Sequence, residues 1–249
     1  MQKFNYGNRF YNEALQTPDD EGLRKYFLEV YYLMSMGLLL TALAAWSVFS
    51  IPTLTSLMFD IGPEEQLIRI TKMGWIITFA PLAVSLYFTL GINRITSQNA
   101  QMLFWLYSVL VGMSFASFGF IYTSYSIIKT FFICSAMFAG MSLYGYSTKN
   151  DLTSMGGFLF MSLVGLLIAS LINILFLSPV LEFILSIIGV FIFIGLIAFD
   201  TQKLKELYYQ GAVANNNIGI LAAFTLYLDF LNLFLYLLRI LGARRHTKK

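Results

Sequence analysis

The stretch IGILAAFTLYLDFLNLFLYLLRIL, which runs from Ile218 to Leu241, is apolar apart from a few side chains. As an α-helix, with a rise of about 1.5 Å per residue, it is long enough to cross a bilayer core of about 30 Å. Asp229 lies near its middle, where an ionised carboxylate costs about 2.5 kcal/mol or more. Such a residue persists only if it is paired, hydrated or protonated. The rest of the chain is therefore expected to supply its partner.

The composition places the whole chain in a membrane. Of its 249 residues, 58% are hydrophobic and only 12% are charged, and the mean hydropathy is +0.71. A soluble domain has about 25% charged residues, so we predict an all-α integral membrane protein that contacts the lipid bilayer. The net charge is only +3, and no basic groove with interleaved aromatic residues is visible. We therefore expect no nucleic-acid partner.

The residue inventory excludes several kinds of chemistry. Cys134 is the single cysteine, so the chain can form no internal disulfide and no cysteine metal site. The single histidine, His246, lies near the C-terminus, which excludes histidine catalysis within the membrane. The first residues are polar and have no apolar core, so we expect no cleavable signal peptide.

Seven apolar spans follow one another along the chain. They are Leu28–Phe49, Met73–Ile92, Met102–Tyr122, Ile127–Tyr144, Phe158–Leu177, Val180–Phe199 and Ile218–Leu241. We predict a polar N-terminal leader at 1–27, a seven-helix transmembrane domain at 28–241 and a basic C-terminal tail at 242–249. The connections are short except Ser50–Lys72 and Thr201–Asn217, and Leu177-Ser178-Pro179 is typical of a tight hairpin.

Counting the positive charges on the two sides of the membrane does not decide the orientation. With the N-terminus inside, the 16 Lys and Arg residues divide equally between the two sides, because the C-terminal tail is basic. The first span usually dominates, and Arg24-Lys25 immediately precedes it. We therefore predict a cytoplasmic N-terminus. The alternative is a re-entrant last span that returns the basic tail to the cytoplasm.

Asp200 is the second unusual carboxylate, at the end of the sixth span. Taken alone, Asp200 could as well be an ordinary interfacial residue that faces water as a member of a functional site. However, Asp at the C-terminal end of a helix opposes the helix dipole, and no breaker occurs before Gly211. We predict that the sixth helix continues about two turns past Asp200 and that the antiparallel seventh starts near Asn217. This arrangement lets the carboxylates of Asp200 and Asp229 meet.

Two further polar residues are candidates for the same site. Arg94 follows the second span and is expected on the same side as Asp200, either as its counter-ion or as an arginine extended to the membrane surface. Asn232 lies one turn after Asp229 and can share its face of the helix. Its amide could orient the carboxyl group, solvate an ion, or simply bond to a neighbouring helix.

Two adjacent carboxylates cannot both be ionised at low cost, so we expect the pair to hold about one proton near neutral pH. Such a pair suits a proton-sensitive latch, a cation site or acid hydrolysis. Intramembrane aspartyl proteases carry Gly-x-Gly before their second aspartate, whereas Tyr227-Leu228 precedes Asp229 here. We expect no enzyme activity. The last span also contains no lysine, which excludes a retinal protein.

Several motifs resemble those of the Bax inhibitor-1 family, also called the transmembrane Bax inhibitor motif family. The resemblance covers nearly the whole chain after the leader and is closest to the bacterial branch, which implies a bacterial inner membrane. It is carried by Met36-Gly37-Leu38, Phe104-Trp105-Leu106-Tyr107, Tyr144-Gly145-Tyr146, Phe199-Asp200-Thr201-Gln202-Lys203 and Leu226-Tyr227-Leu228-Asp229-Phe230-Leu231-Asn232.

The resemblance implies six helices wrapped around a central C-terminal one. It also implies a pH-sensitive calcium leak gated by an aspartate pair, for which Asp200 and Asp229 match. Arg94 matches the counter-ion arginine, although the loop around it differs in length from that of some relatives. Calcium is then the transported ion, held by Asp200 and Asp229, and no cofactor is expected. Family members are also described as suppressors of cell death or modulators of membrane proteases.

The main hypothesis is thus a slow, proton-regulated calcium leak, with Arg94, Asp200 and Asp229 as gate and pH sensor and Asn232 in support. Acid is expected to open the path by removing the charge that Arg94 holds, while a clamp with a shared proton would give the opposite sign. The alternative hypothesis is a non-conducting regulator that binds other membrane proteins.

Overall fold

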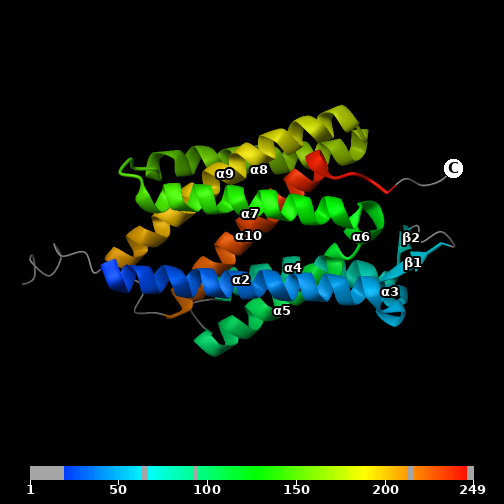
Figure 1. The fold of residues 1–249 in the computed structure, drawn as a ribbon, viewed down its shortest axis with the longest axis horizontal. Coiled ribbons are helices and arrows are strands. Elements are labelled where there is room, and N and C mark those ends of the chain that lie inside the picture. The colour runs from blue at the N-terminus through cyan, green and yellow to red at the C-terminus, as the bar shows by residue number, and fades with distance from the viewer. Residues whose placement is uncertain (1–19, 63–66, 92–94, 212–215, 246–249) are drawn as a thin grey trace, which may run out of the picture.

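The structure is a computed structural model that describes residues 20–62, 67–91, 95–211 and 216–245. Within those residues, seven helices long and apolar enough to cross a membrane form one bundle (Figure 1). They are α2 (Asp20–Ser50), α4 (Lys72–Gly91), α5 (Ser97–Phe115) with the short α6 (Phe118–Ile121), α7 (Ser124–Ser147), α8 (Thr153–Phe176), α9 (Pro179–Tyr209) and α10 (Asn216–Leu241). The prediction of an all-α membrane protein with seven transmembrane helices is confirmed.

The last helix, α10, is the most deeply buried of these seven. It packs against α2, α5, α7 and α9, as expected for a helix that is apolar on all sides. On α4, Phe88 also reaches it, with its ring centre 4.6 Å from that of Phe224. By contrast, α8 packs chiefly against α9. Among the described residues, four helices therefore pack extensively against α10 and a fifth, α4, reaches it through Phe88, while a complete ring of six stays a prediction.

The ends of α9 follow from local sequence signals. Leu177 adopts a left-handed conformation with φ of 49°, and the Ser178 hydroxyl accepts a hydrogen bond from the Leu181 N–H at 3.3 Å. The predicted hairpin is confirmed, with Pro179 in the favoured first position of the helix. The helix then passes through Asp200 and ends at Tyr209, about two turns later, as predicted.

Several helix starts differ from the predicted spans. Helix α2 begins at Asp20, inside the segment predicted as leader 1–27. Helix α8 begins at Thr153 rather than Phe158, and the predicted span Met102–Tyr122 is interrupted between α5 and α6. Hydropathy detects only the part of a helix that lies in hydrocarbon, whereas its first polar turns can continue into the interface, where water satisfies the side chains.

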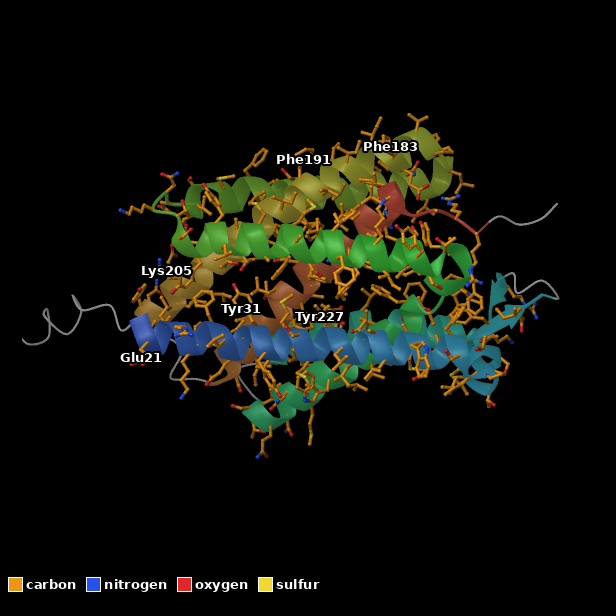
Figure 2. All side chains as sticks on the ribbon, in the orientation of Figure 1. Glu21, Tyr31, Phe183, Phe191, Lys205 and Tyr227 are labelled. Atoms are coloured by element: carbon orange, nitrogen blue, oxygen red, sulfur yellow. The ribbon has the colours of Figure 1, made fainter. Side chains whose placement is uncertain are left out.

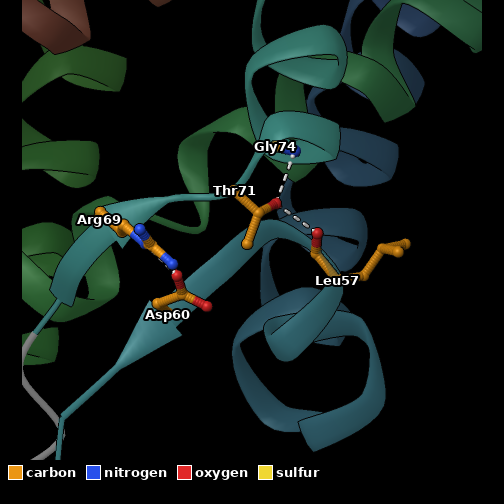
Figure 3. Close-up of polar contacts among 5 residues, drawn as sticks. All are labelled: Leu57, Asp60, Arg69, Thr71 and Gly74. Atoms are coloured by element: carbon orange, nitrogen blue, oxygen red, sulfur yellow. Dashed lines mark hydrogen bonds and ion pairs between the residues drawn. The ribbon is translucent and has the colours of Figure 1, made fainter.

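The connection from α2 to α4, predicted only as a long linker, has a structure of its own. It contains α3 (Pro52–Met58) and an antiparallel pair of strands, β1 (Phe59–Ile61) and β2 (Leu67–Ile70). Asp60 faces Arg69 across the strands, and their side chains form an ion pair (Figure 3). Phe59 is buried with Val48 and Ala116 in a small separate core, which fixes the hairpin to the bundle.

Thr71 joins the hairpin to the start of α4 (Figure 3). Its hydroxyl donates to the Leu57 carbonyl at 2.6 Å and accepts from the Gly74 N–H at 3.0 Å, which is the geometry of a helix N-cap. We expect Thr71→Ala to lower the free energy of unfolding by about 1 kcal/mol, whereas Thr71→Ser keeps the cap. Thermal denaturation in detergent measures both variants, and equal midpoints would contradict the capping role.

The residues after α10 lie along the turn between α6 and α7. The Thr123 N–H donates to the Ala243 carbonyl at 3.0 Å, and the Arg245 N–H donates to the Ile121 carbonyl at 2.9 Å. The first part of the predicted tail 242–249 is therefore packed against the bundle, because backbone pairing satisfies its polar groups. The rest of that tail lies outside the described residues.

The start of α2 and the end of α10 lie at opposite ends of the bundle (Figure 1). Helix α10 runs obliquely behind α2 and α7 from one end to the other without interruption. An uninterrupted helix favours a full crossing over a re-entrant last span, which was the alternative for the orientation. Which end faces the cytoplasm stays a prediction.

Candidate functional site

Helices α9 and α10 bring two carboxyl groups together inside the bundle. Asp200 on α9 and Asp229 on α10 are hydrogen-bonding partners of each other. Asp229 is only 5% exposed, and Asp200 is half-buried. The pair forms because α9 continues for about two turns past Asp200, and the antiparallel α10 then runs back beside it. Asp229, about halfway along α10, thereby reaches the depth of Asp200 in the bundle. The two residues expected to meet are thus neighbours.

One oxygen of the pair has no hydrogen-bond donor from outside the pair. The Oδ2 atom of Asp229 is buried and accepts no hydrogen bond from any other described residue. Buried polar atoms are nearly always satisfied, so this oxygen is available to a proton, a water molecule or a cation.

The described residues contain no group of three or more His, Cys, Asp or Glu side chains that could hold a metal. Calcium takes about six to eight oxygen ligands, and Asp200 with Asp229 supplies only a part of that shell. A tightly held calcium ion therefore does not suit the pair. An ion that keeps much of its water and leaves again suits it better, as conduction requires.

Arg94, the predicted counter-ion, lies outside the described residues, so its pairing with Asp200 stays a prediction. The structure places another cation near Asp200. Lys203, three residues further along α9, attracts the Asp200 carboxylate, and its ammonium lies 5.9 Å from the centre of the Phe199 ring. The spacing of three residues on one helix is the sequence signal for this contact.

Asn232 does not support the pair in the way expected. Its Nδ2 donates to the Leu228 carbonyl at 2.8 Å, within its own helix, and the described structure has no hydrogen bond from it to Asp229. A side-chain amide within a helix can bond to the carbonyl four residues earlier without any change in the backbone. In this conformation the amide of Asn232 is thus engaged within its own helix, and its support of the pair stays a prediction.

A chain of three hydroxyl groups runs beside the carboxyl pair and was not found from the sequence. The Tyr31 hydroxyl on α2 bonds to the Ser142 hydroxyl on α7, and Figure 2 shows Tyr31 in the space between these helices. Ser142 Oγ lies 3.2 Å from Thr201 Oγ1, and Thr201 directly follows Asp200. Three helices are thereby joined at the level of the pair.

The segment of α9 around Asp200 is held firmly against α7 and the connection that follows it. At Gly145 the two backbones are so close that an added Cβ would lie 2.3 Å from the Ala198 carbonyl oxygen. Beyond the pair, the Gln202 side chain accepts from the Leu152 N–H at 2.7 Å and donates to the Asn150 carbonyl at 2.8 Å. Asp200 therefore sits on a helix segment whose position is fixed from both sides.

Comparisons with known proteins agree with this architecture. The family model described as "Inhibitor of apoptosis-promoting Bax1" matches residues 23–246. Protein RP147 of Rickettsia prowazekii (strain Madrid E) is 53% identical over 230 residues, which cover 91% of this chain and 92% of that protein. The inner membrane protein YbhL of Escherichia coli (strain K12) is 42% identical over 228 residues, or 90% of this chain and 94% of YbhL. The chain belongs to the Bax inhibitor-1 family.

Proposed function

We propose that this protein is a slow, proton-regulated leak pathway for cations, calcium among them, and that it is a transport protein rather than an enzyme. The observation that carries the proposal is the contact between the carboxyl groups of Asp200 and Asp229, together with the buried Oδ2 of Asp229, to which no described residue outside the pair donates a hydrogen bond. Ionisable residues within a membrane bundle usually mark an ion or proton pathway, because they are costly elsewhere.

The pair combines two properties that a regulated pathway needs. Two carboxyl groups in contact share protons, so their charge changes with pH as one unit. The same oxygens are the ligands that calcium prefers. A proton and a cation then compete for one place, and acid changes both the charge of the pair and the helix contacts around it.

The packing around the pair is that expected of the closed state of such a pathway. Asp229 is almost completely buried, which supports this assignment. Conduction would require α9 to separate from α10 or α7 near Asp200. Protonation of Asp200 removes the charge that Lys203 attracts and that Arg94 is expected to hold, so acid is proposed to favour the separation.

We further propose that the protein resides in a bacterial inner membrane with its N-terminus in the cytoplasm. The name of the E. coli relative supports the membrane, and Arg24-Lys25 before the apolar part of α2 supports the orientation. The proposed partners are the bilayer, calcium ions and protons. Other membrane proteins are a further class of partner, as the alternative of a non-conducting regulator requires.

Calcium influx into liposomes that contain only this protein tests the proposal. Wild type is expected to admit calcium above the rate of protein-free liposomes, and Asp229→Asn is expected to change that rate severalfold. Asp151→Asn is the matched control, because Asp151 is exposed between α7 and α8. There, hydrogen bonds from Thr153 keep the pKa of the Asp151 carboxyl below its usual value, and an asparagine can accept the same bonds. If wild-type liposomes leak no faster than empty ones, the protein is no leak pathway.

A further inference from the structure

Helices α2 and α7 leave a groove between them on the outside of the bundle. Both pack against α10, but they make few contacts with each other. A cavity of about 880 Å³ extends along them from Arg24 to Phe138, and a second of about 420 Å³ continues toward Phe49. The two cavities share Leu38, Ala42, Phe131 and Phe230, so they form one continuous groove with α10 as its floor.

The groove faces lipid rather than water. Its rim carries Leu39 and Leu143, whose side chains are 50% and 66% exposed, on two helices that cross the bilayer. Protein interiors leave few voids, and an empty apolar cavity of this size is strongly unfavourable. Water is no substitute, because the middle of the groove offers it few polar partners. Something apolar from the membrane must fill the space.

The chemistry changes along the groove. Its middle is apolar, whereas the end near the start of α2 is polar and carries Arg24, Tyr31, Ser142 and Tyr146. In the described part of the chain Arg24 takes part in no ion pair. Close by, Lys205 donates from Nζ to the Tyr146 carbonyl at 2.9 Å. An occupant with an apolar chain and an anionic head is therefore complementary to this groove.

The length and the charge of the groove suit a lipid. From Arg24 to Leu38 the groove follows α2 for about 21 Å, which is about the distance from the headgroup region to the middle of a bilayer. A single acyl chain can follow the apolar part over that length while an anionic headgroup stays beside Arg24.

We propose that the groove between α2 and α7 binds an anionic phospholipid, with its headgroup at Arg24 and an acyl chain along the apolar part toward Phe230. This site is independent of the proposed leak. It also touches the hydroxyl chain, because Tyr31 and Ser142 line the groove and Ser142 contacts Thr201 beside Asp200.

Photo-crosslinking in nanodiscs tests the site. Phosphatidylglycerol and phosphatidylcholine, each with a photoactivatable group in the acyl chain, are compared as probes, and the labelled peptides are mapped by mass spectrometry. We expect labelling to concentrate on α2 and α7 along the groove and to favour the anionic probe. Arg24→Gln should reduce that preference about fivefold, the effect of about one charge, while Arg24→Lys keeps it. Arg24 is exposed, so these variants should fold.

A second pair of variants separates the groove from the general lipid surface. Ala42→Phe with Ala139→Phe fills the groove and should abolish most of the labelling there. The matched control, Ala83→Phe, adds the same side chain to an exposed position on α4 and should change nothing. Labelling spread evenly over α2, α4, α7 and α8 would overturn the proposal. So would groove labelling that is unchanged in the filled variant, or equal labelling of the groove by the two probes.

Discussion

Calcium flux through Asp200→Asn and through Asp229→Asn is expected to lose most of its pH dependence between about pH 5 and pH 8. In the wild type, a switch governed by one proton changes the population of the open state by up to about tenfold per pH unit, and we expect the flux to rise with acid. Each variant leaves a single carboxyl group without its like-charged partner, so the shared titration disappears.

The measurement is the initial rate of calcium influx into liposomes at a series of external pH values. The double variant should behave like either single variant, because the two carboxyl groups act as one unit. His246→Gln and Asp151→Asn serve as controls. The first removes the only histidine of the chain, and the second removes an exposed carboxylate. If both pair variants keep the wild-type profile, the pair is structural and the leak has another sensor.

Gly145→Ala is expected to destabilise the protein by about 1–3 kcal/mol, the usual effect of excess volume in a packed core. The new Cβ would lie 2.3 Å from the Ala198 carbonyl oxygen, which is a backbone atom and can move only with α9. Helices α7 and α9 must therefore separate near Asp200, two residues beyond Ala198. The contact between Ser142 and Thr201 lies in the same interface and should weaken with it.

Gly140→Ala is the matched control on the same helix. Nothing lies within 4 Å of a Cβ built at Gly140, so this variant should be neutral or slightly stabilising, since alanine is the better helix former. Thermal midpoints in detergent compare the two variants, and calcium flux in liposomes reports whether separation near Asp200 opens the path. Equal midpoints would mean that the close approach of α7 and α9 is readily relaxed.

Much of the helix order could be predicted from the sequence, because each signal is local. The run from Ile218 to Leu241 is long and apolar enough to be a membrane helix by itself. The polar but helix-favouring residues after Asp200 indicated that α9 continues, and the break near Gly211 indicated where it stops. The lengths of α9 and α10 and their antiparallel arrangement then determine how deep Asp200 and Asp229 each lie in the bilayer. Because the two depths are similar, their contact could be predicted.

Other parts of the site were not foreseeable, because they depend on how the helices rotate and pack. No spacing in the sequence links Tyr31, Ser142 and Thr201, which come from three helices. Asn232 shares a face with Asp229, yet its amide bonds within its own helix, since a nearby carbonyl was available. The strands β1 and β2 were missed because a few residues of alternating polarity resemble any loop.

The sequence by itself determined that the chain is a multi-pass membrane protein with seven long helices and two carboxyl groups at similar depth. Composition and helix rise suffice for this, because burial in lipid acts on each segment separately. Only the tertiary structure decided which side chains surround the pair, how closely Gly145 approaches Ala198, and that α2 and α7 leave a groove. In a bilayer the apolar faces that meet protein and those that meet lipid are alike in composition, so packing alone distinguishes them.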